Sequence, residues 1–328
     1  MDSEVPRQPI LVRLLRRGWP WLVGIGVLAF VATRIPYDAF RAALTQGPHV
    51  QLAAVACVLL VVILCTDSVA TWIGLRAIAM PRPLATVLAV RGATYVLFLV
   101  NYAVGQGGFG YYLNRSGAPP LRAVGATLFL MGTNFATLLL VTTVAWELHG
   151  GDGFPVLRWT LLGGCAAFAV YLVVIAIAPR VIARRQMFAP LFEGGLRGHA
   201  LAMLGRLPHT AIVVLGHWIA IRVWGVPVPF VVGVALMPVV AIVQVLPISP
   251  AGLGTTQAAF VYFFSAYAPG ATDELRGANI LAFGTVYMVY GMLASIVVGL
   301  TCTPFARRLD RRDHTNAPAG VVDERGGR

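Results

Sequence analysis

Two short motifs share the ending Gly-(Phe/Leu)-Gly and interrupt apolar stretches in which a helix is otherwise expected. They span residues 105–110, with the sequence GQGGFG, and residues 249–254, with the sequence SPAGLG. Glycine loosens a helix and proline breaks it, so each motif predicts a helix break. In lipid such breaks survive only where protein buries them or where they line a wet cavity. Paired breaks in the two halves of a membrane protein indicate a transport site.

The second motif predicts the better-defined chemistry. The half-helix expected at 255–268 exposes its first amide N–H groups beside the break, and these groups favour an anion such as phosphate. The alternative is that Ser249 and Thr255 only satisfy their own backbone. The candidate substrate-binding residues in this motif are Ser249, Pro250, Gly252, Gly254, Thr255 and Gln257.

The first motif is rich in small residues that let a ligand or another backbone approach closely. Its candidates are Gly107, Gly108 and Gly110, and the side chains best suited to hydrogen-bond a ligand are Asn101 and Gln106. The alternative is that the glycines serve the tight packing of a helical hairpin.

Two charges, Asp67 and Arg91, fall inside apolar stretches. A charge at the bilayer centre costs about 2.5–3.5 kcal/mol on insertion scales, so both are functional candidates by default. We hypothesise an ion pair between them, which either contacts a ligand headgroup or only locks the surrounding helices together.

The composition indicates an integral membrane protein. Of the 328 residues, 58% are hydrophobic and 12% are charged, whereas a soluble domain carries about 25% charged residues. The net charge of +12 comes from arginines that cluster beside apolar segments. This pattern is typical of membrane topology, so we expect no nucleic-acid partner.

The sequence offers little for catalysis. The cysteines lie in apolar runs without metal-ligand spacing, and we interpret them as small buried hydrophobic residues. Paired carboxylates, a Ser-His-Asp order and a metal motif are not found in the apolar part of the sequence. We therefore expect no metal, no cofactor and no enzymatic activity.

The placement of arginine also orients the chain. A basic N-terminus at 1–17, a basic connector at 179–208 and a disordered basic tail at 306–328 are all expected in the cytoplasm. Between the two ends lies a single transmembrane domain at 18–305, whose halves are 18–178 and 209–305. Six full spans are expected at about 18–35, 50–73, 123–146, 159–178, 209–224 and 278–302.

Two further apolar stretches, 84–112 and 230–268, must each begin and end on the same side of the membrane. Each is too short for two full spans. We interpret each as a re-entrant helical hairpin with its motif near the tip or on the returning arm. The predicted fold is all-α: a polytopic membrane helix bundle of about six spans plus two re-entrant hairpins, arranged as an inverted repeat. The alternative is eight plain spans with two kinked helices.

The residues around the second motif resemble the second signature of the flippase-like family, also called the lysylphosphatidylglycerol synthase transmembrane-region family. That signature reads Pro-Ile-Ser-Pro-Gly-Gly-Leu-Gly, two residues, then Glu-Ala, and residues 246–259 are similar to it. Residues 101–113 resemble the first signature, and the similarity covers most of 19–305. The family's Glu stands here as Gln257, and Gly284 lies where the family often has Arg. These departures favour neutral hydrogen-bonding recognition, or a differently charged substrate.

The resemblance implies a multi-pass protein of the bacterial or archaeal cytoplasmic (inner) membrane, with both termini in the cytoplasm by the arginine pattern. It implies a translocase for a phospholipid or a polyisoprenoid-linked precursor, with a mid-membrane site formed by the two breaks. The expected partners are membrane lipids, with a homo-oligomer or a separate lipid-modifying enzyme as further partners. Few residues follow Cys302, so the aminoacyltransferase domain of some members is not expected. The alternatives are a small-solute or ion secondary transporter, or a non-catalytic membrane subunit of a lipid-modifying system.

Overall fold

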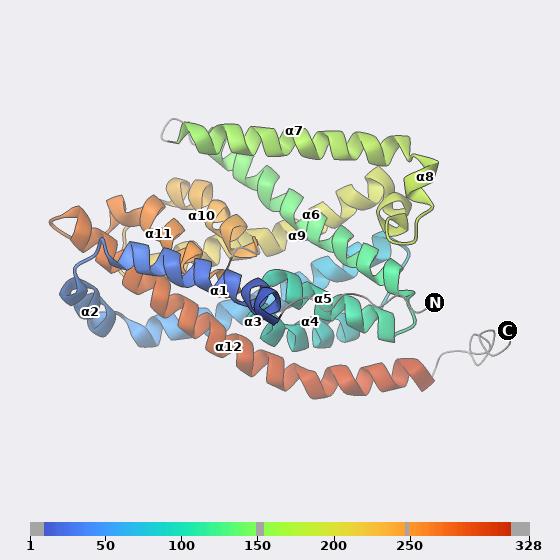
Figure 1. The fold of residues 1–328 in the computed structure, drawn as a ribbon, viewed down its shortest axis with the longest axis horizontal. Helices are drawn as coiled ribbons and strands as arrows, with labels where there is room; N and C mark the ends of the chain where they lie inside the picture. The colour runs from blue at the N-terminus through green and yellow to red at the C-terminus, as the bar shows by residue number, and fades with distance from the viewer. Residues whose placement is uncertain (1–9, 149–153, 247–248, 316–328) are drawn as a thin grey trace.

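The computed structural model describes residues 10–148, 154–246 and 249–315, with side chains between residues 21 and 308 of these ranges. All regular secondary structure in this part of the chain is helical (Figure 1). The first half holds α1 (Ile10–Ala32), α2 (Tyr37–Gln46), α3 (His49–Ala77), α4 (Leu84–Phe98), α5 (Tyr102–Arg115), α6 (Pro120–Leu148) and α7 (Pro155–Ile177). The second holds α8 (Arg180–Ala183), α9 (Ala189–Val223), α10 (Phe230–Val245), η1 (Pro250–Gly252), α11 (Thr255–Phe264), η2 (Ser265–Tyr267) and α12 (Asp273–Thr315).

Among the described residues, five helices are long and apolar enough to cross a membrane, namely α3, α6, α7, α9 and α12. A sixth is counted if α1 and α2 form one bent span; the two helices meet at an angle of 102°. A helix needs about 20 apolar residues to cross the hydrocarbon core. The predicted all-α, polytopic helix bundle is therefore confirmed.

Apolar side chains cover the outside of the bundle as well as its core. Helix α7 buries only Leu161 and Ile175, while Val170 is 65% exposed and Ile177 is 70% exposed. In water such a helix would leave a large apolar face without a partner. The exposed apolar face of α7 is therefore favourable in lipid rather than in water.

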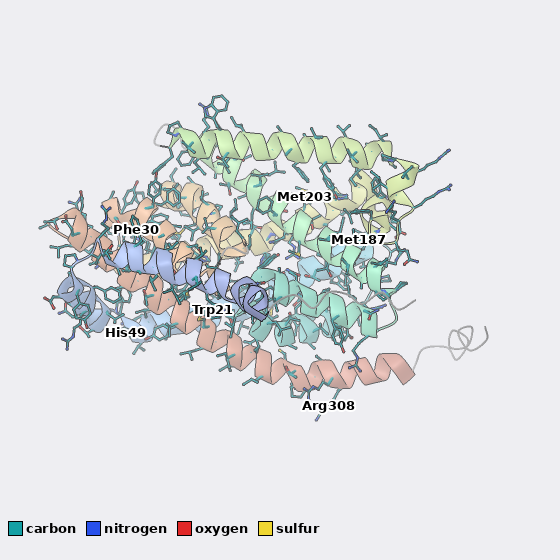
Figure 2. All side chains as sticks on the ribbon, in the orientation of Figure 1. Trp21, Phe30, His49, Met187, Met203 and Arg308 are labelled. Carbon is teal, nitrogen blue, oxygen red and sulfur yellow. The ribbon has the colours of Figure 1, made fainter. Side chains whose placement is uncertain are left out.

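Helix α1 is attached to the bundle by one narrow stripe. It packs on η1 and α11, with Gly24 as the contact point. Among the side chains described for this helix, Trp21, Leu22, Ile25 and Phe30 are exposed, and Figure 2 labels the first and last of them. This helix therefore covers the second chain break from outside.

Two helical hairpins enter the bundle from opposite ends. In Figure 1, α4 and α5 come from the right-hand end, where α8 and the end of α12 lie, and α10 and α11 come from the left-hand end, where α2 lies. The chain turns back inside the bundle between the arms of each hairpin. None of the four hairpin arms, α4, α5, α10 and α11, is long enough to cross a membrane on its own.

The two halves of the chain show the same pattern of contacts between helices, with each helix of one half in the place of its counterpart in the other. At the centre, α3 packs along α9, and around it α4 packs on α12 as α10 packs on α6. Likewise α5 packs on α6 as α11 packs on α12. Exchanging α3–α6 with α9–α12 thus reproduces the pattern, and the opposite directions of the hairpins make it an inverted repeat.

Helices extend into three segments that were predicted to lie outside the spans. The predicted basic connector at 179–208 is largely helical, because α9 begins at Ala189 and continues, through a break at Gly195 (φ 54°), to Val223. The predicted disordered tail is helical as far as Thr315, the end of α12. Helix α1 begins at Ile10, within the predicted basic N-terminus; residues 1–9 and 316–328 lie outside the described part.

Candidate functional site

The first chain break lies at residues 99–101, before the glycines rather than among them. Helix α4 ends at Phe98 and α5 starts at Tyr102, so the motif at 105–110 is helical throughout. Asn101 caps α5, because its side-chain oxygen accepts a hydrogen bond from the Val104 N–H at 2.8 Å. The prediction of a break at the glycines was therefore wrong, and the motif lies on the returning arm of the hairpin.

The glycines of this arm allow close helix packing. A Cβ at Gly105 would overlap the ring of Phe98, and one at Gly108 would overlap Leu97 on the other arm. Gly107 and Gly110 instead line a groove of about 360 Å³ on the side of α5 that faces α6. The packing alternative thus describes Gly105 and Gly108, and also Gly110, where a Cβ would lie 2.7 Å from the Thr127 hydroxyl of α6. None of the motif's glycines lines the central cavity described below.

The second break is where it was predicted. Helix α10 ends at Val245 and α11 starts at Thr255. Between them Ala251, Gly252 and Gly254 have φ angles of 49°, 75° and 78°, which place the chain in the left-handed region that favours glycine. Pro247 and Ile248 lie outside the described residues.

The polar residues of the second break bond mainly to the break itself. The hydroxyl oxygens of Ser249 and Thr255 are 3.0 Å apart, and Thr255 donates to the Gly252 carbonyl at 3.2 Å. Gln257 accepts from the Gly254 N–H at 2.8 Å, and its amide nitrogen is 3.1 Å from the Met288 sulfur. This arrangement matches the alternative in which Ser249 and Thr255 satisfy their own backbone.

Gly254→Ala is expected to destabilise the fold more than Gly117→Ala. Both positions have positive φ, which costs a residue with a Cβ about 1–2 kcal/mol. At Gly254 the new methyl group would also overlap the Gly24 carbonyl oxygen of α1, whereas at Gly117 it meets nothing within 4 Å. Thermal unfolding in detergent measures both variants, and equal losses would show that α1 does not press on the break.

Both breaks open onto one cavity between the halves of the molecule. A chamber of about 280 Å³ is lined by Phe98, Leu99 and Tyr102 from the first break and by Gln244 and Ala251 from the second. Most of its remaining wall is apolar and belongs to α3 and α12: Ala56, Leu59, Leu60, Ile63, Gly284, Tyr287, Met288, Gly291 and Met292. We call this space the apolar chamber.

A second chamber of about 230 Å³ adjoins the first. The two chambers are neighbours, because both are lined by Phe98, Tyr102, His217 and Gln244. The side chain of Gln244 is exposed where they meet. Because Asp67, Arg91 and Arg206 line the second space, we call it the charged chamber.

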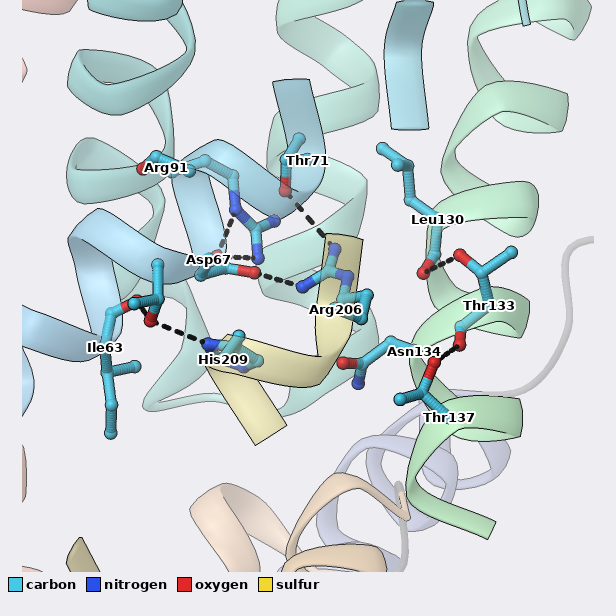
Figure 3. Close-up of polar contacts among 12 residues, drawn as sticks. Ile63, Asp67, Thr71, Arg91, Leu130, Thr133, Asn134, Thr137, Arg206 and His209 are labelled. Carbon is cyan, nitrogen blue, oxygen red and sulfur yellow. Dashed lines mark hydrogen bonds and ion pairs between the residues drawn. The ribbon is translucent and has the colours of Figure 1, made fainter. Parts of the chain in front are cut away.

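The charged chamber is built around a single carboxylate (Figure 3). Arg91 donates from Nε to Asp67 Oδ2 at 2.7 Å, and its Nη2 lies 2.5 Å from the same oxygen. Arg206 donates from Nη1 to the other oxygen, Asp67 Oδ1. All three side chains are at most 5% exposed. The hypothesis of an Asp67–Arg91 ion pair is confirmed, and a second arginine joins it.

Neutral groups surround these charges. Arg91 donates to Gln106 Oε1 at 3.0 Å, and its guanidinium lies over the rings of Phe98 and Phe109. On the other side Arg206 Nη2 is 3.3 Å from the Thr71 hydroxyl. Gln106, predicted as a ligand for substrate, therefore holds Arg91 in place.

Arg206 is the charged residue that the arginine pattern misplaced. It was assigned to the cytoplasmic connector, but it lies inside α9 and is 2% exposed. A signal was present in the sequence, because Arg206, Thr210 and His217 follow each other at spacings of four and seven residues. Such spacings place polar side chains on one face of a helix.

Comparison of the sequence with models of known protein families finds no matching family, and comparison with curated proteins finds no matching relative. The resemblance to the flippase-like family therefore rests on the motif residues alone.

Proposed function

We propose that this protein moves lipids, or lipid-linked precursors, across a membrane, as the flippase-like resemblance implies. One observation carries the proposal: two adjoining cavities, one lined by buried charges and the other mostly by apolar side chains, lie where the two hairpins meet. An amphiphile has the same two parts. Its headgroup fits the charged chamber, and part of an acyl or isoprenoid chain fits the apolar chamber.

The apolar chamber distinguishes a lipid from a small solute or an ion. Its wall presents aliphatic and thioether side chains such as Leu59, Met288 and Met292. A hydrated ion gains little from such a wall, because apolar surfaces offer no replacement for its water ligands. Methionine side chains are flexible and accommodate chains of variable shape.

The inverted repeat supports a path to both leaflets. Transporters built from inverted repeats place their site at the repeat interface and expose it alternately to the two sides. Here each end of the bundle contributes one hairpin to the cavity wall. We propose that the hairpins act as the two access elements, in a cytoplasmic membrane with both termini on the cytoplasmic side.

Reconstitution tests the proposal directly. The purified protein is inserted into liposomes that carry a fluorescent phospholipid in both leaflets, and a membrane-impermeant quencher is added outside. Lipid movement is expected to expose the inner-leaflet lipid to the quencher, so fluorescence falls below the level in protein-free liposomes. If the fluorescence after quenching equals that of protein-free liposomes for every phospholipid and isoprenoid-linked lipid tested, the proposal is overturned.

Gly108→Leu is expected to slow this lipid movement strongly, because its side chain forces the arms of the first hairpin apart at Leu97 and Thr94. The matched control is Gly107→Leu, one residue earlier on the same arm, where a Cβ meets nothing within 4 Å. The quenching rate of each variant is compared with the wild type. Equal rates for the two variants would show that the packing of this hairpin does not matter for transport.

A further inference from the structure

The charged chamber holds more positive than negative charge. Asp67 is the only buried acidic side chain among the described residues, while Arg91 and Arg206 are both buried. Arginine keeps its charge at any physiological pH. The cluster therefore carries one positive charge in excess on buried side chains.

The other described acidic groups do not supply the missing charge. Glu147 pairs with Arg158, Glu193 pairs with Arg122, and Asp273 pairs with Arg276, all in exposed positions. Asp38 and Glu274 are also exposed. A buried charge without a partner is strongly unfavourable, so an anion from outside the protein would stabilise the cluster.

The chamber also holds a polar group that no protein atom satisfies. The hydroxyl of Thr210 is buried in the wall of the charged chamber and has no hydrogen-bond partner. Thr210 is 1% exposed and lies one turn after Arg206 on α9. Two independent features, an excess charge and an unpartnered buried hydroxyl, thus belong to residues that line the same space.

We propose that the charged chamber binds a singly charged phosphate group between Arg206 and Thr210. A phosphodiester matches the excess of one charge, and guanidinium groups bind phosphate oxygens by parallel charge-assisted hydrogen bonds. The inference rests on the proposed function, in which the phosphate belongs to a lipid headgroup. It reverses the expectation of neutral recognition that the departures from the family signature favoured.

Binding to the purified protein in a neutral detergent tests the site without any transport. Isothermal titration uses three probes: dihexanoyl phosphatidylglycerol, dihexanoyl glycerol and inorganic phosphate. The phosphatidylglycerol is expected to bind at least tenfold more tightly than the neutral glycerol lipid. Tighter binding of the lipid than of inorganic phosphate identifies the headgroup as the source, and equal binding of the two identifies a free phosphate site. Equal binding of the two lipids would overturn the proposal.

Arg206→Met is expected to weaken phosphatidylglycerol binding about tenfold or more, because it makes the cluster neutral while Asp67 keeps its pair with Arg91. The matched control is Arg222→Met, on the same helix, where the arginine lies over Trp218 and lines neither chamber. Unchanged binding by Arg206→Met would overturn the proposal.

Thr210→Val provides a test that does not disturb the charges. It is expected to weaken phosphatidylglycerol binding about tenfold, the effect of one hydrogen bond to a charged group, and Thr210→Ser is expected to restore it. Lipid movement in liposomes separates this proposal from the previous one. If Arg206→Met moves lipid at the wild-type rate, the transport function is retained and the phosphate site is excluded. If the wild-type protein binds the phosphate group but moves no lipid, the phosphate site is retained and the transport function is excluded.

Discussion

Gly291→Trp is expected to reduce lipid movement to the level of protein-free liposomes while the fold stays intact. Gly291 lines the apolar chamber from α12, and a Cβ at this position meets nothing within 4 Å. The indole therefore enters the chamber without displacing the backbone. It occupies much of a space of about 280 Å³ that a lipid chain would otherwise use.

The control for this substitution is Gly132→Trp. Gly132 is exposed, a Cβ there also meets nothing within 4 Å, and the residue lines neither chamber. The unfolding temperature of Gly291→Trp should equal or exceed that of the wild type, because the ring gains packing contacts in an existing space. A stable Gly291→Trp protein that moves lipid at the wild-type rate would place the lipid path elsewhere.

Asp67→Asn is expected to lower the free energy of unfolding by about 3–5 kcal/mol, the cost of breaking a buried ion pair. The substitution removes the carboxylate that both Arg91 and Arg206 bind. Two buried guanidinium groups then face each other without a counter-charge. Unfolding in detergent by heat or by added denaturant measures the loss.

Two comparisons isolate the buried cluster as the cause. Asp273→Asn removes an acid whose side chain is 94% exposed and pairs with Arg276 at 3.4 Å, and such exposed pairs contribute about 0–1 kcal/mol. Adding Arg206→Met to Asp67→Asn is expected to restore part of the lost stability, because it removes one of the two opposed charges. A loss for Asp67→Asn no larger than for Asp273→Asn would contradict the account of the cluster.

The second break could be predicted from sequence because its residues dictate local conformation. Gly252 and Gly254 occupy positive φ angles that are costly for most other residues, and a proline at 250 cannot continue the preceding helix. The two hairpins followed from arginine placement and segment length. Backbone conformation and the preference of a segment for lipid or water are local properties, which do not depend on the partner helices.

The first break was misplaced because glycine has two uses. Gly105 and Gly108 are helical and allow α4 and α5 to approach, and this packing outweighs the weak helix propensity of glycine. The better signal was Asn101 in an apolar run, since asparagine is a preferred helix N-cap. Which use applies depends on the neighbouring helix. The sequence does not specify that Gly105 and Gly108 pack against α4.

The charged chamber could be predicted only in part. Asp67 and Arg91 were recognised because a charge within an apolar run is costly in lipid and needs a partner or a function there. Arg206 lies in a stretch with further arginines, so the rule for cytoplasmic arginines accounted for it equally well. Only the packing of α3 along α9 shows that Arg206 reaches Asp67, which lies 139 positions earlier in the chain.

In the proposed function a lipid occupies the space between the two hairpins. A phospholipid with a photoactivatable acyl chain, cross-linked to the protein in liposomes and mapped by mass spectrometry, tests it most directly. We predict cross-links to Leu59, Met288 and Met292 in the apolar chamber, and their loss in Gly291→Trp. Cross-links confined to outward residues such as Val170 and Ile177 of α7, unchanged in that variant, would contradict the account.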